Sequence, residues 1–348
     1  MGETRSPVSV SVIVPTWNGA GRIQHCLAAL HNQNFDRPFE VIVVNDGSTD
    51  DTLEVVAGYE RVRVISQPNA GPAAARNRGA REALGDIVVF TDDDCEPLPG
   101  WLTEMSKPFA APEVAGAKGI YRTRQKGIIP RFVQTEYEDR YRRMGRLSEI
   151  DFIDTYSAAF RRDRFLEMDG YDVIFPVACA EDVELSYRMS ARGWKMVFVP
   201  TAIVYHNHPR DFASYLKKKY KFAFWRVMAV KKNPSKAIRD SHTPQLMKLQ
   251  MLFGPALAAG LVGDLFRLSP VPLSALVALV FLLSALPFSM RAFRKSALVG
   301  TLSPIILAAR SGAQLLGVFA GARHAFLGSA TDFLHVAGKS PAESDDIP

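Results

Sequence analysis

Three consecutive aspartates, Asp92, Asp93 and Asp94, follow the apolar run at residues 87–90 after a single threonine. A buried strand that ends there holds three carboxylates together at a sheet edge, where like charges destabilise each other unless a cation lies between them. Mg²⁺ and Mn²⁺ prefer oxygen ligands, and Mg²⁺ usually leaves most of its positions to water and substrate phosphates. The triplet therefore predicts a metal site for a diphosphate-bearing substrate. The alternative is a solvated acidic turn that caps the next helix.

Alternating strand-like and helical segments, up to about residue 122, would position this triplet. Such alternation predicts an α/β fold with a parallel sheet covered on both faces, and ligands in these sheets gather at the carboxyl ends of the strands. Polar residues follow three of these ends, at 16–18, 45–48 and 92–94, which predicts a nucleotide-sized crevice. The expected strands are 8–14, 39–44, 62–65 and 86–90, and the expected helices are 22–30, 52–57 and 72–84.

Residues from about 123 to 210 should supply the wall for the second substrate. We expect a basic, Tyr-rich helical stretch at 131–146, short strands near Phe152 and at 196–199, and a helix at 181–192. The chain's 348 residues suit two or three domains, and three cysteines without metal-type spacing fit a reducing compartment.

Residues 211–230 predict an amphipathic helix with an aromatic, apolar side and lysines elsewhere. Between residues 212 and 239 there is no acidic residue, although the whole chain has a net charge of only +6. This pattern predicts an interfacial helix on an anionic membrane surface, and we expect no nucleic-acid partner. The alternative is an ordinary helix docked on the catalytic core.

Three apolar segments follow this helix. Residues 249–266 and 271–288 predict a membrane hairpin, and the basic residues that flank it predict a multi-pass protein with a cytoplasmic catalytic part. The third segment, 297–322, is interrupted by Pro304 and Arg310. It would span the membrane, re-enter it, or lie flat with Arg310 snorkelling to the interface.

Four segments, in this order, resemble the inverting family 2 glycosyltransferases of the GT-A fold. They are VSVIVPTWNGAGRIQHCLAAL, EVIVVNDGSTDDT, NAGPAAARNRGAREALGDIVVFTDDDCEP and AEDVELSYRMSARGWKMVFVP, and the resemblance covers about residues 8–208. It implies a Rossmann-like, mostly parallel sheet and transfer of a sugar from a nucleotide diphosphate sugar. It also implies Mg²⁺ or Mn²⁺ as cofactor and a single displacement that inverts the anomeric centre.

The resemblance divides the aspartate triplet. Asp92 and Asp94 align with the family's Asp-x-Asp motif, which binds the ribose and the metal that bridges the diphosphate. We expect Asp94 to ligate the metal, Asp92 to face the ribose, and Asp93 to occupy the variable place, from which it could substitute for Asp94 geometrically.

Further positions match the family's nucleotide pocket. Asp46 is similar to a base-binding aspartate that accepts a hydrogen bond from a uracil-type ring, which favours a UDP-type donor. The alternative for Asp46 is an Asx turn or a helix cap. Pro15, Thr16 and Asn18 should line the same pocket. Arg76 matches an arginine that approaches the base or the diphosphate in relatives, although alone it would be read as an exposed helix charge.

The chemical step falls to another motif. Glu181 and Asp182 resemble the family's Glu-Asp pair, and an inverting transfer needs one base to take the acceptor proton. We expect Asp182 to be that base and Glu181 to orient the acceptor or a neighbouring arginine, and the alternative for both is helix capping. Either His206 or His208 should touch the metal, with His206 in the better-matching place. Residues 155–160 should form the floor for the donor sugar and the acceptor.

We therefore predict a membrane-anchored, non-processive glycosyltransferase for cell-envelope polysaccharide, acting on a lipid-linked, glycan or other membrane-proximal acceptor. KFAFWR lacks the Gln-x-x-Arg-Trp order of processive synthases. The alternatives are such a processive synthase and a non-catalytic, membrane-tethered sugar-nucleotide binding protein. The expected parts are a glycosyltransferase domain at 1–210, a basic helix and linker at 211–248, membrane helices at 249–325 and a tail at 326–348.

Overall fold

The computed structural model describes residues 8–175, 179–236, 241 and 243–327, and these form two compact units. The first unit contains residues 8–124 and 141–207, and the second contains residues 125–140 and those from 208 on. Residues 125–140, which the sequence assigned to the acceptor half of the catalytic domain, thus group with the C-terminal helices. Most of the predicted tail, from residue 328 on, lies outside the described residues.

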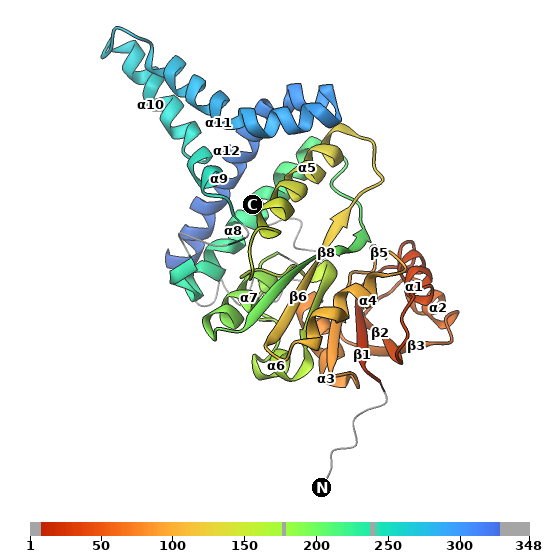
Figure 1. The fold of residues 1–348 in the computed structure, drawn as a ribbon. Coiled ribbons are helices and arrows are strands. Elements are labelled where there is room, and N and C mark those ends of the chain that lie inside the picture. The colour runs from red at the N-terminus through yellow and green to blue at the C-terminus, as the bar shows by residue number, and fades with distance from the viewer. Residues whose placement is uncertain (1–7, 176–178, 237–240, 242, 328–348) are drawn as a thin grey trace. The chain divides into compact units, whose positions relative to one another are not determined.

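The first unit is built on an eight-stranded mixed sheet with strand order β3-β2-β1-β4-β7-β6-β8-β5 (Figure 1). The strands from β3 to β4 are mutually parallel, as predicted, whereas β7 runs antiparallel to both β4 and β6. The strands are β1 (Val10–Thr16), β2 (Phe39–Asp46), β3 (Val62–Gln67), β4 (Ile87–Phe90), β5 (Glu96–Pro97), β6 (Val114–Arg122), β7 (Ala158–Arg161) and β8 (Lys195–Tyr205).

The strands β1 and β4 are the centre of the sheet and are buried along their whole length. Both are continuous runs of mostly β-branched residues, which is the pattern of strands covered on both faces. Val12 of β1 pairs with Val41 of β2 on one side and with Val89 of β4 on the other. This register brings the ends of β1, β2 and β4 to the same edge of the sheet.

Short helices connect the strands, and their ends follow local sequence signals. In α3, Pro72 occupies the first helical turn after Gly71, whose φ of +87° favours glycine. Gly47 has φ +75°, and a Cβ there would lie 2.8 Å from the backbone N of Asn69. The helices of this unit are α1 (Ile23–His31), α2 (Thr52–Ala57), α3 (Pro72–Glu82), α4 (Trp101–Ser106), α6 (Arg162–Glu167) and α7 (Glu181–Ala191), while α5 (Ile128–Met144) belongs to both units.

The described part of the second unit contains α5 residues 128–140, a 3-10 turn at Pro234–Lys236 and five further α-helices. They are α8 (Phe212–Lys232), α9 (Gln245–Gln250), α10 (Phe253–Leu265), α11 (Leu273–Lys295) and α12 (Ala297–Leu327).

The aromatic side of α8 packs against protein rather than lying free for lipid. Tyr215 meets Phe132 of α5 edge to face, with ring centroids 5.7 Å apart. On α12, a Cβ at Gly317 would lie 2.4 Å from the carbonyl oxygen of Tyr220, and one at Gly321 would lie 2.5 Å from that of Phe224. The prediction that this side of α8 lies on a membrane is therefore wrong at these positions, which other helices cover. Small residues on α12 allow the two helix backbones to approach closely.

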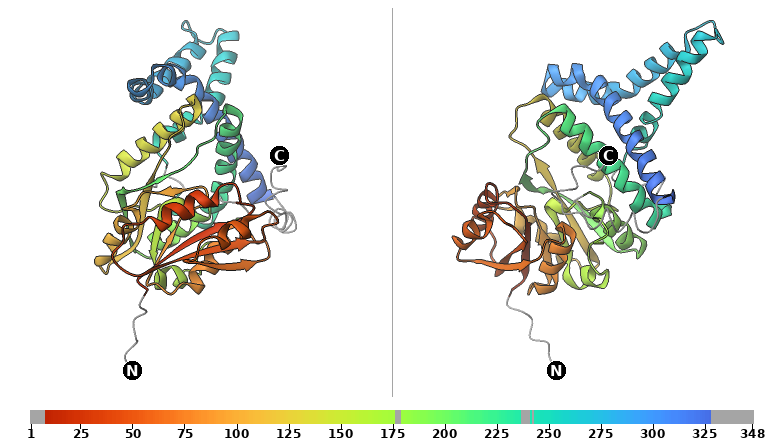
Figure 2. Two further views of the ribbon diagram at one scale, coloured as in Figure 1. Left: turned by 90° about the vertical axis from the view of Figure 1, so that its right-hand side faces the viewer. Right: turned by 180° about the vertical axis from the view of Figure 1, so that it is seen from behind.

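The predicted hairpin forms, but with a short first arm. In both views of Figure 2, α10 and α11 lie side by side. With 13 residues, α10 reaches about 20 Å, less than the hydrocarbon core of about 30 Å. Asp264, the charge inside the predicted first span, accepts hydrogen bonds from the backbone N–H groups of Leu273 and Ser274 and so caps α11. Only α11 and α12, among the described helices, are long and apolar enough to cross a membrane.

Arg310 is buried in the second unit and does not snorkel. Its guanidinium pairs with Glu136 of α5 at 2.9 Å and donates to Gln250 at 2.7 Å. Lys219 of α8 also pairs with Glu136, at 2.9 Å. Burial favours the neutral form of Glu136, but Lys219 and Arg310 outweigh it and lower the pKa of Glu136 to about 2. This ion cluster ties together α5, α8 and α12, and the charge that interrupts the third apolar segment is thereby neutralised.

Candidate active site

The ends of β1 and β2 are held together by Asn18. Its side-chain oxygen accepts from the backbone N–H of Thr49 at 2.8 Å, and its own backbone N–H donates to Ser48 Oγ at 3.0 Å. Asn18 has φ +48°, a left-handed conformation that asparagine adopts more readily than most residues. Pro15 and Thr16 are the last residues of β1, beside this junction. The strand ends thus converge as the sequence predicted.

Asp46 is the last residue of β2 and is buried. Its carboxylate accepts from Gln67 Nε2 at 2.7 Å and from the backbone N–H groups of Ala70 at 2.9 Å and Gly71 at 2.8 Å. These donors occupy three of about four acceptor positions of a carboxylate. Asp46 therefore fixes the loop before α3, and one acceptor direction is left for a ligand.

The three aspartates after β4 point to different partners. Asp93 is buried, and its carboxylate accepts from Thr16 Oγ1 and from Arg22 Nε, both at 2.7 Å. Burial raises the pKa of Asp93, while Arg22 and Thr16 oppose that shift. Asp92 pairs with Arg76 at 2.7 Å. Asp94 turns toward His206 instead.

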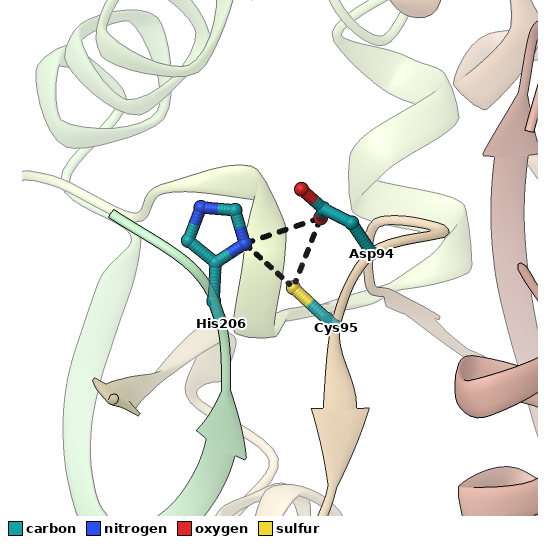
Figure 3. Close-up of side chains that lie close together, drawn as sticks. All are labelled: Asp94, Cys95 and His206. Atoms are coloured by element: carbon teal, nitrogen blue, oxygen red, sulfur yellow. Dashed lines mark hydrogen bonds and ion pairs between the residues drawn. The ribbon is translucent and has the colours of Figure 1, made fainter. Parts of the chain in front are cut away.

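Asp94, Cys95 and His206 form a compact cluster, shown in Figure 3. Asp94 Oδ1 lies 3.2 Å from His206 Nδ1, and the Cys95 sulfur lies 3.7 Å from the former and 3.9 Å from the latter. Cys95 is fully buried, which raises the pKa of its thiol well above the ordinary value. The ring of Tyr121 stacks on His206, with centroids 4.6 Å apart. A carboxylate oxygen and an imidazole nitrogen at this separation fit one divalent cation.

His208 has a different environment from His206. It is buried in the second unit, where its Nε2 lies 3.0 Å from Gln134 Oε1 and its ring stacks on Tyr137. Of the two histidines that the sequence offered, His206 alone lies beside the aspartate triplet in the described part of the chain.

Arg76 connects the triplet to α7. Its guanidinium, only 2% exposed, donates to Asp92 Oδ1 at 2.7 Å and to Glu181 Oε1 at 3.1 Å. The other Glu181 oxygen accepts from the backbone N–H groups of Cys179 at 2.8 Å and Ala180 at 3.1 Å. Arg76 is thus a buried bridge rather than an exposed helix charge. Of the two roles expected for Glu181, the structure shows the pairing with a neighbouring arginine.

Asp182 stands at the first turn of α7, next to Glu181, and is partly exposed. Burial raises the pKa of Asp182 to about 7, the negative charge of Glu181 adds to the shift, and the Val183 N–H and the Arg76 charge oppose it. The N–H bond to Asp182 measures 2.7 Å. A carboxylate with a pKa near neutrality can exchange a proton with a hydroxyl at neutral pH.

Sequence reasoning missed two members of this site, Cys95 and Tyr121. It also predicted the position of a floor, at residues 155–160, without naming contacts for it. Cys95 was not singled out, although it directly follows the triplet, and Tyr121 lies on the unpredicted strand β6. The predicted floor at 155–160 contains Tyr156, whose ring stacks on Tyr121, so the segment does lie next to the ring that covers His206.

Comparison with known proteins gives a consistent family. Residues 11–168 match the family model described as "Glycosyl transferase family 2". The chain is 26% identical over 219 residues to the pre-mycofactocin glycosyltransferase of Mycobacterium tuberculosis, covering 60% of this chain and 45% of that protein. It is 30% identical over 229 residues to the validoxylamine A glucosyltransferase of Streptomyces hygroscopicus subsp. jinggangensis, covering 56% and 54%. The chain thus spans about half the length of these relatives.

A solved structure extends the likeness beyond the family match. The mannosyltransferase PcManGT of Pyrobaculum calidifontis, solved with GDP-Man and Mn²⁺, superposes with a TM-score of 0.61 at 21% sequence identity. The match covers 92% of this chain and 88% of that one. At this level of identity the likeness shows the fold, which is a mixed α/β sheet of GT-A type followed by C-terminal helices.

Proposed function

We propose, from the premise that this chain belongs to glycosyltransferase family 2 by its residues 11–168, that it transfers one sugar from a nucleotide diphosphate sugar to an acceptor hydroxyl. In this proposal the enzyme inverts the anomeric centre, depends on a metal ion and works at a membrane surface. UDP-type donors are favoured by the position of Asp46 at the end of β2, where one acceptor direction of its carboxylate is left for a base N–H.

The observation that carries the proposal is the Arg76 bridge. One buried guanidinium holds Asp92, from the loop after β4, and Glu181, from the start of α7. In the proposed mechanism Asp94, two residues after Asp92, binds the metal. Asp182, which follows Glu181, is the general base. The bridge supports the proposal because it ties the loop of Asp94 to the first turn of α7, and such positioning supplies much of the rate enhancement in transfer reactions.

Asp182 acts as the base in this mechanism. Its carboxylate takes the proton of the acceptor hydroxyl while the acceptor oxygen bonds to the anomeric carbon. The bond from that carbon to the diphosphate oxygen breaks at the same time, and its electron pair leaves with the nucleoside diphosphate. Because attack and departure occur on opposite faces, the anomeric configuration inverts. A pKa of about 7 suits this role near neutral pH.

Asp94 and His206 would hold the divalent cation. When bound, the cation neutralises the charge that develops on the departing diphosphate. Arg76 places its charge beside Asp92, which lies on the same loop as Asp94. Tyr121 holds the imidazole ring of His206 in one plane by stacking.

A membrane surface is the proposed location, with a lipid-linked or membrane-proximal acceptor. Leu265, the last residue of α10, and Phe266 and Leu268, in the turn that follows it, are 78%, 68% and 73% exposed. Exposed apolar side chains of this size are unfavourable in water and stable in lipid. The basic C-terminal end of α11 would stay on the cytoplasmic side with the catalytic unit.

The test is turnover of a panel of UDP-, GDP- and TDP-sugars by the purified full chain, with and without Mn²⁺. We expect transfer from at least one donor, loss of transfer without a divalent cation, and loss by about 10²- to 10⁴-fold in Asp182→Asn. Asp163→Asn is the matched control, since the Asp163 side chain is 74% exposed on α6. Metal-independent turnover, or full activity in Asp182→Asn, would refute the mechanism.

A further inference from the structure

The cluster of Asp94, Cys95 and His206 offers three chemically different donors to one point. Asp94 contributes a carboxylate oxygen, His206 an imidazole nitrogen, and Cys95, the residue before β5, a sulfur (Figure 3). Hard cations such as Mg²⁺ bind oxygen ligands in preference to sulfur, whereas Zn²⁺ and Co²⁺ bind oxygen, nitrogen and sulfur.

The three edges of this donor triangle can be compared with those of a tetrahedral and an octahedral site. The O···N edge lies between the two, and both sulfur edges are a few tenths of an ångström longer than the tetrahedral value. Bonds of about 2.0 Å to nitrogen and oxygen and about 2.3 Å to sulfur, at tetrahedral angles, place nitrogen and oxygen about 3.3 Å apart and sulfur about 3.5 Å from each. The observed edges are 3.2 Å for O···N, 3.7 Å for S···O and 3.9 Å for S···N. An octahedral Mg²⁺ with bonds of about 2.1 Å would need neighbouring ligands only about 3.0 Å apart.

We propose that Cys95 is a third protein ligand of the metal site and that the site therefore takes a thiophilic divalent cation, Zn²⁺ or Co²⁺, in tetrahedral geometry. The inference rests on the metal site of the proposed function. Coordination replaces the thiol proton, which leaves to the solvent. With three protein ligands the fourth position is open, as in catalytic zinc sites, and a diphosphate oxygen or a water would occupy it. Mg²⁺ and Mn²⁺ would bind the same pocket through Asp94 and His206, without the sulfur.

The decisive experiment is optical titration of the metal-free full chain with Co²⁺. Cobalt bound through sulfur gives a near-ultraviolet sulfur-to-metal charge-transfer band, which oxygen and nitrogen ligands do not produce. We expect the band in the wild-type chain and in Cys179→Ser, a control at a partly exposed cysteine, and its loss in Cys95→Ser. Because loss of an outer-shell partner alone costs about 10- to 100-fold in affinity, we expect Zn²⁺ affinity in Cys95→Ser to fall at least about 100-fold. Mn²⁺ affinity should stay within error of the wild type.

A wild-type chain that binds Co²⁺ without the band, or a Cys95→Ser variant that keeps it, overturns the inference. The wild-type spectrum decides even if Cys95→Ser fails to fold. Sugar transfer with Mn²⁺, measured on the same preparation, separates the two proposals. A band without transfer leaves the metal inference standing and refutes the proposed function. Sugar transfer without the charge-transfer band supports the proposed function and refutes the metal inference.

Discussion

At the scale of single residues, three adjacent aspartates have three different environments. Asp93 is enclosed between Thr16 and Arg22, Asp92 pairs with a buried guanidinium, and Asp94 turns toward His206. The differences arise from tertiary neighbours, since all three residues are aspartates of one short stretch. A substitution at each position should therefore affect a different property of the protein.

The Asp93→Asn and Asp94→Asn variants test this division. Asp93→Asn should lower the free energy of unfolding by about 1–3 kcal/mol, because Arg22 loses a charged partner at a buried carboxylate, and should leave metal affinity unchanged. Asp94→Asn should weaken metal binding by at least about 10-fold with little change in stability. Chemical denaturation and calorimetric metal titration measure the two effects. If Asp93→Asn lost metal affinity and Asp94→Asn kept it, Asp93 would be the metal ligand and Asp94 would not.

Activity should depend on pH through Asp182. The base acts in its ionised form, whose fraction rises with pH, so kcat/KM should increase about tenfold per pH unit below about 7 and level off above it. The profile is measured at saturating metal, so that metal binding does not limit the rate. A rate that is constant from about pH 5 upward would assign the proton transfer to another group.

Sequence reasoning proposed Asp94, His206, Glu181 and Asp182 as site residues, and these roles stay predictions. It did not give most of the contacts that the structure shows around them. The order of motifs along the chain is enough to predict which strand ends meet. It suggested an arginine beside Glu181, but not that this arginine is Arg76 or that Arg76 also pairs with Asp92. It gave no sign that the Cys95 sulfur turns toward His206. Such contacts depend on side-chain directions, which only the folded sheet determines.

At the scale of elements, α12 is shaped to receive α8. Gly317 and Gly321 are four residues apart, on the same side of α12, and each lies where a methyl group would meet the backbone of α8. The aromatic side of α8, which looked suited to lipid, is thus covered by a neighbouring helix. Amphipathicity predicts that a helix has a buried side, but it does not say whether lipid or protein covers that side.

Substitutions of these glycines test the helix contact. Gly317→Ala and Gly321→Ala should each lower the free energy of unfolding by about 1–3 kcal/mol, because the added Cβ forces the backbones apart. Gly312→Ala is the matched control on α12. Among the described residues, a Cβ there would meet no atom within 4 Å outside its own helix, so the change should be neutral or stabilise by up to about 1 kcal/mol. Equal thermal shifts in all three variants would contradict the close contact.

The strands show where pattern reasoning succeeds and where it fails. The first four strands and the helices between them were predicted within a few residues, because their apolar runs and turn residues alternate regularly. The predicted strand near Phe152 is wrong: that segment is irregular and the strand is β7, at Ala158–Arg161. β7 is only four residues long and contains two alanines, so it has little β-propensity of its own and is stabilised by its neighbours β4 and β6.

At the scale of the whole molecule, the chain combines a mixed α/β unit with an apolar helical unit. The predicted first span is replaced by α9 and the short α10, and two described helices are long enough to cross a membrane. We expect the turn between α10 and α11 to insert into lipid.

Charged substitutions in this turn test the membrane proposal. Each glutamate introduced by Leu265→Glu and Leu268→Glu should cost on the order of 3 kcal/mol in hydrocarbon, and the double variant should therefore partition at least about 100-fold less into vesicles. Leu84→Glu and Leu147→Glu, exposed leucines of the first unit at 55% and 49%, are the controls and should not change partitioning. Flotation of the full chain with phosphatidylcholine and phosphatidylglycerol vesicles gives the answer. Unchanged flotation of the double variant would exclude the turn as a membrane element.

The central claim is a single inverting displacement from a nucleotide diphosphate sugar. Proton nuclear magnetic resonance of the reaction mixture, recorded while the full chain turns over an α-linked donor, tests it most directly. We predict release of the nucleoside diphosphate together with a newly formed β-glycosidic linkage, and neither signal in Asp182→Asn. A product with retained α configuration, or no turnover with any donor of the panel, would contradict the account.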